Sequence, residues 1–401
     1  MATEISEQEN SLAFEIVDSI GQINARDWNR IVPADYPFLF HEFLHALEES
    51  GCVSKNTGWA PQHILIRNLA SQNQEVIGAA PLYLKGHSWG EFIFDFNWAH
   101  GYEQAGLNYY PKLISHTPFT PVTSPKLLVP DDHRAPKTRK LIVRTAQKIA
   151  RQFNLSSTHW HFISEEDSKT LDSLEFLSRA STFEYIWHNQ GYNSMDDFLG
   201  ELSSRKRKKI RSERRSIGEQ GITIDVVQGE ELEPSHWKLI DLFIQQTVEK
   251  YRSHKYLSLD FFQRIGQTIP ENLVLFLAHI DQNPVAGSFC LQGKNKLFGR
   301  YWGTLAEFRN LHFEMCYYAA IEYCIDRGLS EYSAGVQGDH KLSRGFLPRL
   351  ARSSHSFLSP SIEVEIGHYI DRETSHMQAY CQALDYYSAY AKRPTESALH
   401  E

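Results

Sequence analysis

Apolar and polar residues alternate along the chain with two periods, one typical of strands and one typical of helices. In the first half, strand-like runs span residues 63–67, 76–84 and 91–96. Apolar residues at helical spacing predict a helix over 139–153, and the alternating run 157–163 predicts a further strand. The first half is therefore expected to be a mixed α/β domain.

The second half carries a clearer pattern, which begins near Gly191. Helices are predicted at 195–202, 205–215, 236–251, 259–268 and 311–327, and strands at 222–227, 273–280, 285–292, 296–302 and 329–333. Turn residues at 282–284 and 293–295 separate three consecutive strands, so these strands should form an antiparallel meander. The resulting order is β-α-α-β-β-β-α-β, and the first half resembles a weaker version of it.

Length and composition indicate two globular domains. The chain has 401 residues, which exceeds one ordinary domain, and we expect domains at 1–190 and 191–401. Hydrophobic residues make up 41% and charged residues 22%, as is typical of a packed protein. We therefore predict a mixed α/β (α+β) fold that needs no disulfide or metal for its core.

Neither the cysteines nor the N-terminal segment indicates secretion. The five cysteines are widely spaced and include no CxxC pair, as expected of reduced thiols. The first residues lack the apolar core of a signal peptide, and no run of 18 apolar residues is present to span a bilayer. These features predict a cytoplasmic protein without a transmembrane segment.

Positive charge is concentrated in one predicted helix, although the net charge of the chain is −8. Residues 205–215 hold eight basic groups and one acid. Crowded cations repel each other, so an acidic partner surface or a polyanion such as RNA would relieve them. The candidate contacts are Arg205, Lys208, Lys209 and Arg211. The alternative is a solvated helix face, and the lack of interleaved aromatic residues argues against base stacking.

The segment Gly335–Phe346 has the composition of a binding or catalytic loop. It directly follows the last predicted strand, which is where α/β proteins commonly place sites. Its glycines allow close approach of the backbone to a ligand, and Asp339, His340, Lys341 and Arg344 supply a base, donors and anion contacts. A solvated surface loop with turn glycines is the equally weighted alternative.

Two further segments carry candidate groups. In the helix 311–327, Glu314 and Tyr318 lie on one face, while Cys316 belongs to an apolar stripe that is expected to be core. In the aromatic-rich segment Trp89–Tyr110, Asp95 lies between large apolar neighbours. A desolvated carboxylate there would have a raised pKa and would serve as a base, or it would be a satisfied structural group.

Several common mechanisms find no motif in this chain. HExxH and other clustered His/Cys spacings are absent, and so are a P-loop and a GxSxG nucleophile elbow. We therefore expect no metal site.

Five long motifs are similar to those of a bacterial and plant family of predicted N-acyltransferases. They are Tyr83–Asp95, Tyr109–Leu113, Pro118–Thr123, Leu311–Tyr318 and Gly338–Phe346. That family is placed in the GNAT superfamily, near the Fem-type peptidoglycan aminoacyltransferases, and the resemblance covers nearly the whole chain. It implies two GNAT-like folds in tandem, each a mostly antiparallel sheet flanked by helices, and transfer of an acyl or aminoacyl group to an amine.

Acyl transfer to an amine requires a base for the amine proton and donors for the developing oxyanion. The candidate catalytic residues are Asp339, His340, Glu314, Tyr318 and Asp95. The candidate donor- or substrate-binding residues are Lys341, Arg344, Gly338, Arg300, Tyr317, Lys85 and His87.

The sequence departs from the family and superfamily patterns at informative places. Asp339 stands where the family usually has Glu, and the Asp usual near His100 is missing. The GNAT pyrophosphate loop pattern Q/R-x-x-G-x-G/A is not found in Gly303–Asn310. The donor therefore stays open between acyl-CoA and aminoacyl-tRNA, with no tightly bound cofactor and with a small-molecule or peptide amine as acceptor.

A second function follows from the same departures. A GNAT-like protein that has lost its donor site would be a non-catalytic binding protein, which would contact RNA or another polyanion through the basic helix. An open, amide-lined channel between the strands 296–302 and 329–333 would favour the enzyme.

Overall fold

The chain divides into two compact units, and each unit combines segments that are distant in sequence. The computed structural model describes residues 12–384 and 387–391. The first unit contains the described chain up to Pro33, Phe38–Thr182 and Ala351–Met377, and the second contains Ala34–Pro37, Phe183–Leu350 and the described residues from Gln378 onward.

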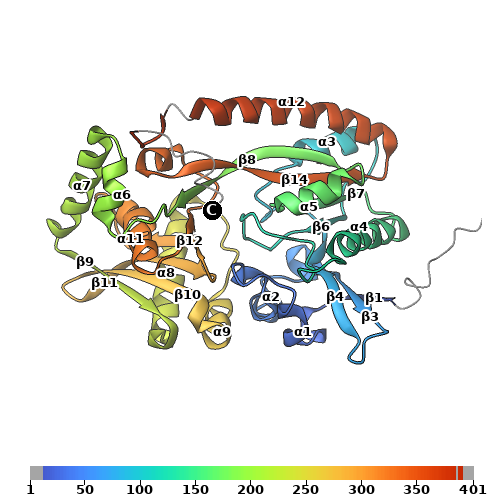
Figure 1. Ribbon diagram of the computed structural model, residues 1–401, viewed down its shortest axis with the longest axis horizontal. Coiled ribbons are helices and arrows are strands. Elements are labelled where there is room, and N and C mark those ends of the chain that lie inside the picture. The colour runs from blue at the N-terminus through green and yellow to red at the C-terminus, as the bar shows by residue number, and fades with distance from the viewer. Residues whose placement is uncertain (1–11, 385–386, 392–401) are drawn as a thin grey trace, which may run out of the picture. The chain divides into compact units, whose positions relative to one another are not determined.

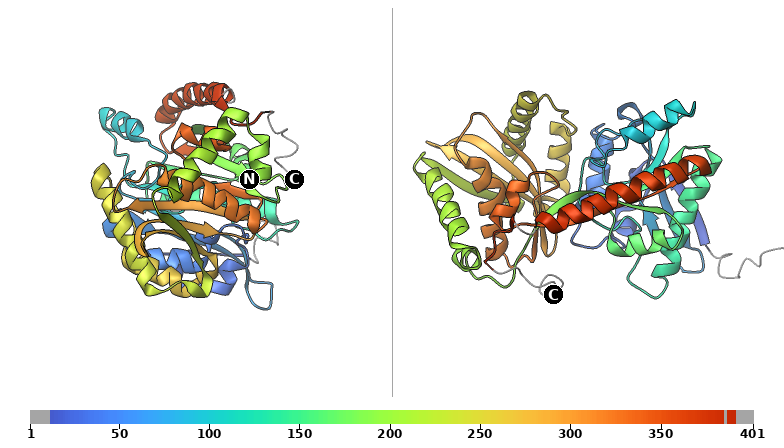
Figure 2. Two further views of the ribbon diagram at one scale, coloured as in Figure 1. Left: turned by 90° about the vertical axis from the view of Figure 1, so that its left-hand side faces the viewer. Right: turned by 90° about the horizontal axis from the view of Figure 1, so that it is seen from above.

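This division differs from the one expected at residues 190 and 191. The segment Ala351–Met377 belongs to the first unit because the end of strand β14 (Leu347–Phe357) pairs with strand β7 (Ser157–His161). The long elements β8 (Leu177–His188), β14 and α12 (Pro360–Leu384) each have residues in both units. Figure 2 shows α12 as one long, unbroken helix.

The first unit holds two sets of strands and a group of short and long helices (Figure 1). Its further strands are β1 (Leu12–Val17), β2 (Trp59–Pro61), β3 (His63–Asn68), β4 (Glu75–Ala80), β5 (Leu82–Lys85) and β6 (Lys112–Ser115). Its helices are α1 (Ala25–Asn29), α2 (His41–Glu49), α3 (Phe96–Gln104), α4 (Ala135–Gln152) and α5 (Glu165–Asp172). The strand orders are β1-β3-β4 and β2-β5-β6-β7-β14.

Helix α4 organises the core of the first unit. Ile142, Val143, Ala146 and Ile149 recur at helical spacing and are buried. They pack with Trp160 of β7 and with apolar residues of β3 and β4 in one cluster. The helix predicted at 139–153 is therefore confirmed, with one further turn at its N-terminus.

The second unit is built on the predicted meander. Its strands are β9 (Ile222–Gln228), β10 (Leu273–Ile280), β11 (Asn283–Gln292), β12 (Lys296–Thr304) and β13 (Glu331–Ser333), in the order β8-β13-β12-β11-β10-β9. Its helices are α6 (Met195–Glu201), α7 (Ser204–Gly218), α8 (Pro234–Tyr251), α9 (Leu259–Thr268), α10 (Leu311–Phe313) and α11 (Ala319–Asp326). A π-helical turn, η7 (Glu314–Tyr318), joins α10 to α11.

Helices cover both faces of this meander. Neighbouring residues of a strand point to opposite faces, so Gly287 and Ser288 of β11 identify the two layers. Gly287 lies against Ile240 and Phe243 of α8, whereas the Ser288 Oγ lies 3.8 Å from the Cys316 Sγ of η7. The sheet is therefore packed between α8 on one face and the α10–α11 helix on the other.

Two predictions for the first half are wrong. Residues 91–95 form no strand, because Gly90 and Phe92 have φ angles of 83° and 58° that interrupt extended backbone, and α3 begins at Phe96. The run 76–84 is two strands, β4 and β5, interrupted at Pro81, which has no N–H to donate to a ladder. Within the described ranges, no helix is both long and apolar enough to cross a membrane.

We predict that Gly303→Ala destabilises the second unit. A Cβ at Gly303 of β12 would lie 2.1 Å from backbone atoms of Phe243 in α8, and a helix backbone cannot move aside cheaply. Overpacking of this kind costs about 3 kcal/mol of unfolding free energy. Urea unfolding followed by circular dichroism measures it.

Gly200→Ala is the matched control, because Gly200 lies in helix α6 with open space around it. This variant should be as stable as the parent or more stable by up to about 1 kcal/mol. Equal stability of the Gly303→Ala variant and the parent would contradict the tight packing of α8 on the sheet.

Candidate active site

Strands β12 and β13 pair over three residues and then diverge. The parallel ladder joins Lys296–Phe298 to Glu331–Ser333. Beyond it, Ala334 and Gly335 hydrogen-bond to Tyr185 of β8, while β12 continues to Thr304 and pairs only with β11 among the described strands. Alternate backbone groups from Gly299 onward therefore face the gap between the two strands.

A pocket of about 490 Å³ lies at this divergence, and we call it the β12–β13 pocket. Its lining comes from β12, from the start of the α10–α11 helix and from the loop after β13. The residues are Ser288, Gly299, Arg300, Tyr301, Trp302, His312, Cys316, Tyr317, Tyr332, Ala334, Gln337, Gly338, His340 and Lys341. The pocket lies where an open channel between these two strands was sought, and the Tyr332 hydroxyl packs closely against Gly299.

Tyr317 and His340 form a hydrogen-bonded pair in this pocket. The Tyr317 Oη lies 2.8 Å from the His340 Nε2. Burial, then the charges of Arg344 and Lys341, lower the pKa of His340 below 6.5, so the ring is neutral at pH 7 and can take a proton. Burial raises the pKa of Tyr317 far above 10, so its hydroxyl keeps its proton as a donor.

The loop after β13 seats His340 through a glycine. Gly338 has a φ of 99°, and a Cβ at this position would lie 2.5 Å from the His340 ring. A side chain there would be strained and would displace the imidazole. Gly338 therefore has a positional role in the 3₁₀ turn η8 (Asp339–Arg344).

Lys341 brings a buried cation to the pocket. Its side chain is 5% exposed, and its Nζ donates hydrogen bonds to the carbonyls of Gly335 and Gln337. Burial lowers its pKa to about 8. With Arg300, it supplies the positive charge that an anionic substrate group would meet.

Arg344 is the last residue of η8, and its side chain is not part of the pocket lining. Its guanidinium stacks on Phe313 at 3.6 Å and donates to both carboxylate oxygens of Glu213 in α7 at 3.1 and 3.2 Å. Tyr318 donates its hydroxyl to the same carboxylate. Arg344 and Tyr318 therefore fix η8 and η7 to helix α7.

Glu314 and Asp339 also lie outside the pocket lining. Glu314 accepts from Arg214 at 3.0 Å, and burial raises its pKa despite that charge. Asp339 accepts from Tyr185 at 2.5 Å and from Tyr380 at 3.0 Å. Of the predicted catalytic residues of this unit, the geometry thus brings His340 alone into the pocket.

The remaining predicted residues, Asp95, Lys85 and His87, lie in the first unit. Burial acts to raise the pKa of Asp95, but the charge and hydrogen bond of Lys112, together with hydrogen bonds from Ser88 and Tyr109, lower it. Asp95 therefore matches the alternative of a satisfied structural carboxylate and not that of a base with a raised pKa.

Two ionisable groups near Asp95, Glu91 and Lys85, have strongly shifted pKa values. Burial raises the pKa of Glu91 to about 7 and lowers that of Lys85 to about 7. The Lys85 Nζ lies 3.7 Å above the ring of Trp59 and 3.4 Å from the His87 Nδ1.

The basic helix α7 has one buried and one exposed side. Glu213 and Ile210 are buried, and Arg214 pairs with Glu314 and Glu322. Arg205 and Lys208 are exposed.

Lys209 and Arg211 are also exposed but have acidic neighbours. Lys209 lies 3.7 Å from the Glu213 carboxylate, and Arg211 lies 2.8 Å from that of Asp196. The four candidate contacts of α7 are therefore all exposed, and so is Arg215.

Sequence patterns did not identify three residues of the pocket lining, His312, Trp302 and Cys316, as site residues. Each occurs in a segment that periodicity assigns to a regular helix or strand. They become pocket residues only because β12 and β13 diverge, which no local pattern reports. Of these three residues, His312 offered a sequence signal, because it is a histidine in a predicted helix five residues before Tyr317.

Comparison with known proteins defines the class. The model of the FemAB-like family, described as peptidoglycan biosynthesis/recognition, matches residues 19–392, and the chain belongs to this family. A search of curated proteins finds no significant match. The family match confirms the expected relationship to Fem-type proteins.

Two solved structures show the same fold at low identity, and a third is similar with a lower TM-score. The C-terminal domain of a protein named as a lysylphosphatidylglycerol synthetase from Agrobacterium fabrum is 8% identical, with a TM-score of 0.53 over 87% of this chain and 96% of that one. L-PGS from Bacillus licheniformis is 10% identical, with a TM-score of 0.50 over 82% and 96%. A tandem GNAT protein from the clavulanic acid biosynthesis pathway is 10% identical, with a TM-score of 0.45 over 87% and 99%.

We predict that Arg344→Met destabilises the second unit. The change leaves the Glu213 carboxylate, which is 7% exposed, without its main cation. Removal of one partner of a buried ion pair costs about 3 kcal/mol. Thermal unfolding measures the loss.

The control is Arg215→Met, which removes an exposed cation from α7, the helix that carries Glu213. It should change the stability by less than about 0.5 kcal/mol. Similar losses in both variants would show that the Arg344–Glu213 pair does not hold η8 in place.

Proposed function

We propose that the protein is an N-acyltransferase that moves an acyl or aminoacyl group from an activated donor to an amine, with the reaction in the β12–β13 pocket. The observation that carries this proposal is the divergence of β12 from β13 beside the Tyr317–His340 pair. The open edge of β12 offers backbone amides to the acyl group. A neutral imidazole and a protonated phenol lie at the same place.

The chemistry follows from these groups. The amine nitrogen attacks the acyl carbon, and a C–N bond forms while the bond from that carbon to the donor's sulfur or oxygen breaks. His340 takes the proton that the amine loses, and the departing sulfur or oxygen receives a proton from the Tyr317–His340 pair. Backbone amides of β12 stabilise the charge on the acyl oxygen in the transition state.

The donor is proposed from charge. Lys341 and Arg300 suit an anionic part of the donor or acceptor. The exposed cations of α7 suit a longer polyanion, and they favour an aminoacyl-tRNA donor over acyl-CoA. The family's description supports the proposal of a peptidoglycan-related amine as the acceptor.

The same cations support the second candidate, a non-catalytic protein that binds RNA through α7. Thermal-shift assays with acyl-CoA and with aminoacyl-tRNA distinguish the two functions, since a ligand of the folded state raises the unfolding midpoint. Transfer to an amine, detected by mass spectrometry, belongs to the enzyme alone.

We predict an acid limb in the pH profile of transfer. His340 must be neutral to act as a base, and its pKa lies below 6.5, so kcat/KM should fall as the pH drops below that value. Lys341 is a cation below a pKa of about 8, so an anionic ligand should bind more weakly as the pH rises through 8. Steady-state kinetics from pH 5 to 9 measure both limbs.

His340→Gln should lower kcat by about 10²- to 10⁴-fold and abolish the acid limb. His376→Gln is the control, because His376 is exposed on α12. Retention of more than half the parent activity by His340→Gln would overturn the assignment of the base.

We predict that the exposed cations of α7 bind tRNA. Arg205→Glu/Lys208→Glu should weaken tRNA binding by more than about tenfold and reduce the slope of log K against log salt by about 2. Lys238→Glu, an exposed charge reversal on α8, should have little effect. Filter binding at several salt concentrations measures this, and equal affinities of the double variant and the parent would exclude α7 as the contact.

A further inference from the structure

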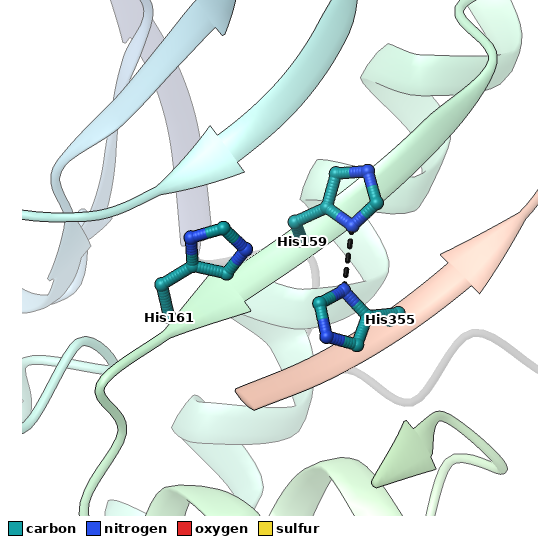
Figure 3. A group of neighbouring side chains, drawn as sticks. All are labelled: His159, His161 and His355. Atoms are coloured by element: carbon teal, nitrogen blue, oxygen red, sulfur yellow. Dashed lines mark hydrogen bonds between the residues drawn. The ribbon is translucent and has the colours of Figure 1, made fainter. Parts of the chain in front are cut away.

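Three histidines from two distant segments meet inside the first unit (Figure 3). His159 and His161 are alternate residues of β7, so their side chains lie on one face of the sheet. His355 of β14 is the register partner of His159 in the antiparallel ladder. One ring nitrogen from each histidine lies within 4.8 Å of the others.

The hydrogen bonds within the described residues do not satisfy His161, the second histidine of this cluster. All three rings are 0% exposed. Neither ring nitrogen of His161 has a hydrogen-bond partner. Buried polar atoms are nearly always paired, so an unpaired imidazole at this depth points to a ligand at the centre of the cluster.

The outer nitrogens of the other two rings are already held by serines. The His159 Nε2 lies 2.7 Å from the Ser157 Oγ, and the His355 Nε2 lies 2.8 Å from the Ser353 Oγ. The two Nδ1 atoms then face each other at 2.7 Å, as Figure 3 shows. Histidines that bind a metal use one nitrogen and hydrogen-bond the other in this way, which fixes the ring.

The surrounding charges are compatible with a cation. The Glu91 Oε2 lies 3.9 Å from the His161 Nδ1, and the Glu91 Oε1 has no hydrogen-bond partner.

The two cations nearest the cluster, Lys112 and Arg179, are already paired. Lys112 contacts Asp95 and Glu91, and Arg179 binds Glu373. Both cations nearest the histidines are therefore already compensated by carboxylates.

We propose that His159, His161 and His355 bind one divalent first-row transition metal, with zinc as the metal that three neutral imidazoles suit best. Glu91 is the carboxylate placed to supply the fourth ligand. Tetrahedral coordination at 2.0–2.1 Å sets neighbouring ligand atoms about 3.3 Å apart. The two facing Nδ1 atoms therefore separate by about 0.6 Å when the metal binds.

The site would act as a staple in the first unit. His159 and His355 are 196 residues apart, and β14 returns to β7 only after the chain has formed the second unit. A metal bound to both strands would hold the returning segment in place. Because binding favours the folded state, it would raise the unfolding midpoint.

The test uses the untagged full-length chain, stripped with a chelator and titrated with Zn²⁺ and with Co²⁺. We expect one equivalent of metal per chain, a Co²⁺ absorption spectrum of tetrahedral type and a zinc-dependent rise in the unfolding midpoint of several degrees. His161→Leu should weaken binding by more than about 100-fold, and Ser353→Ala by about tenfold through loss of ring positioning.

His116→Leu is the matched control. His116 is buried, with its ring 5.9 Å from that of His161, but it contributes no nitrogen to the cluster. This variant should bind zinc like the parent if the proposal holds. Absence of stoichiometric binding to the parent, or equal binding by His161→Leu and the parent, would overturn the proposal. If His161→Leu does not fold, the parent titration and the Ser353→Ala variant decide.

Discussion

The divergence of β12 from β13 is the constraint on which the candidate site depends. Three residue pairs hold the strands together, and the tight packing of Tyr332 on Gly299 marks the point where they separate. Beyond that point, the backbone of β12 has one paired and one open side. A sheet normally covers its unpaired backbone groups, and we therefore propose that a ligand binds at this internal opening next to the tyrosine–histidine pair.

Ion pairs and a hydrogen bond with helix α7 hold the turns η7 and η8 next to this opening. Glu213 joins Arg344 of η8 and Tyr318 of η7, while Arg214 binds Glu314. Three predicted catalytic residues of this unit, Glu314, Tyr318 and Asp339, therefore make contacts outside the pocket lining, whereas His340 and Tyr317 lie in it. Their catalytic roles stay predictions.

The sequence predicts what local spacing controls and misses what depends on distant pairing. The meander β10–β12 and helix α4 follow from periodicity and turn residues, and they form as expected. The predicted strand 91–96 is wrong because Gly90 and Phe92 have positive φ angles, which the pattern of apolar and polar residues does not reveal. The His159–His355 contact joins residues 196 apart, so no spacing along the sequence could have shown that these histidines meet.

Hydrogen–deuterium exchange of the Gly299–Trp302 amides tests the central claim most directly. Acyl-CoA and aminoacyl-tRNA would be added in turn at concentrations at which thermal shift shows binding. The account predicts slower exchange in this stretch and in the loop that carries His340 and Lys341, with no change in β9 at the far side of the meander. Unchanged exchange of Gly299–Trp302 with a donor bound would contradict the placement of the acyl group between β12 and β13.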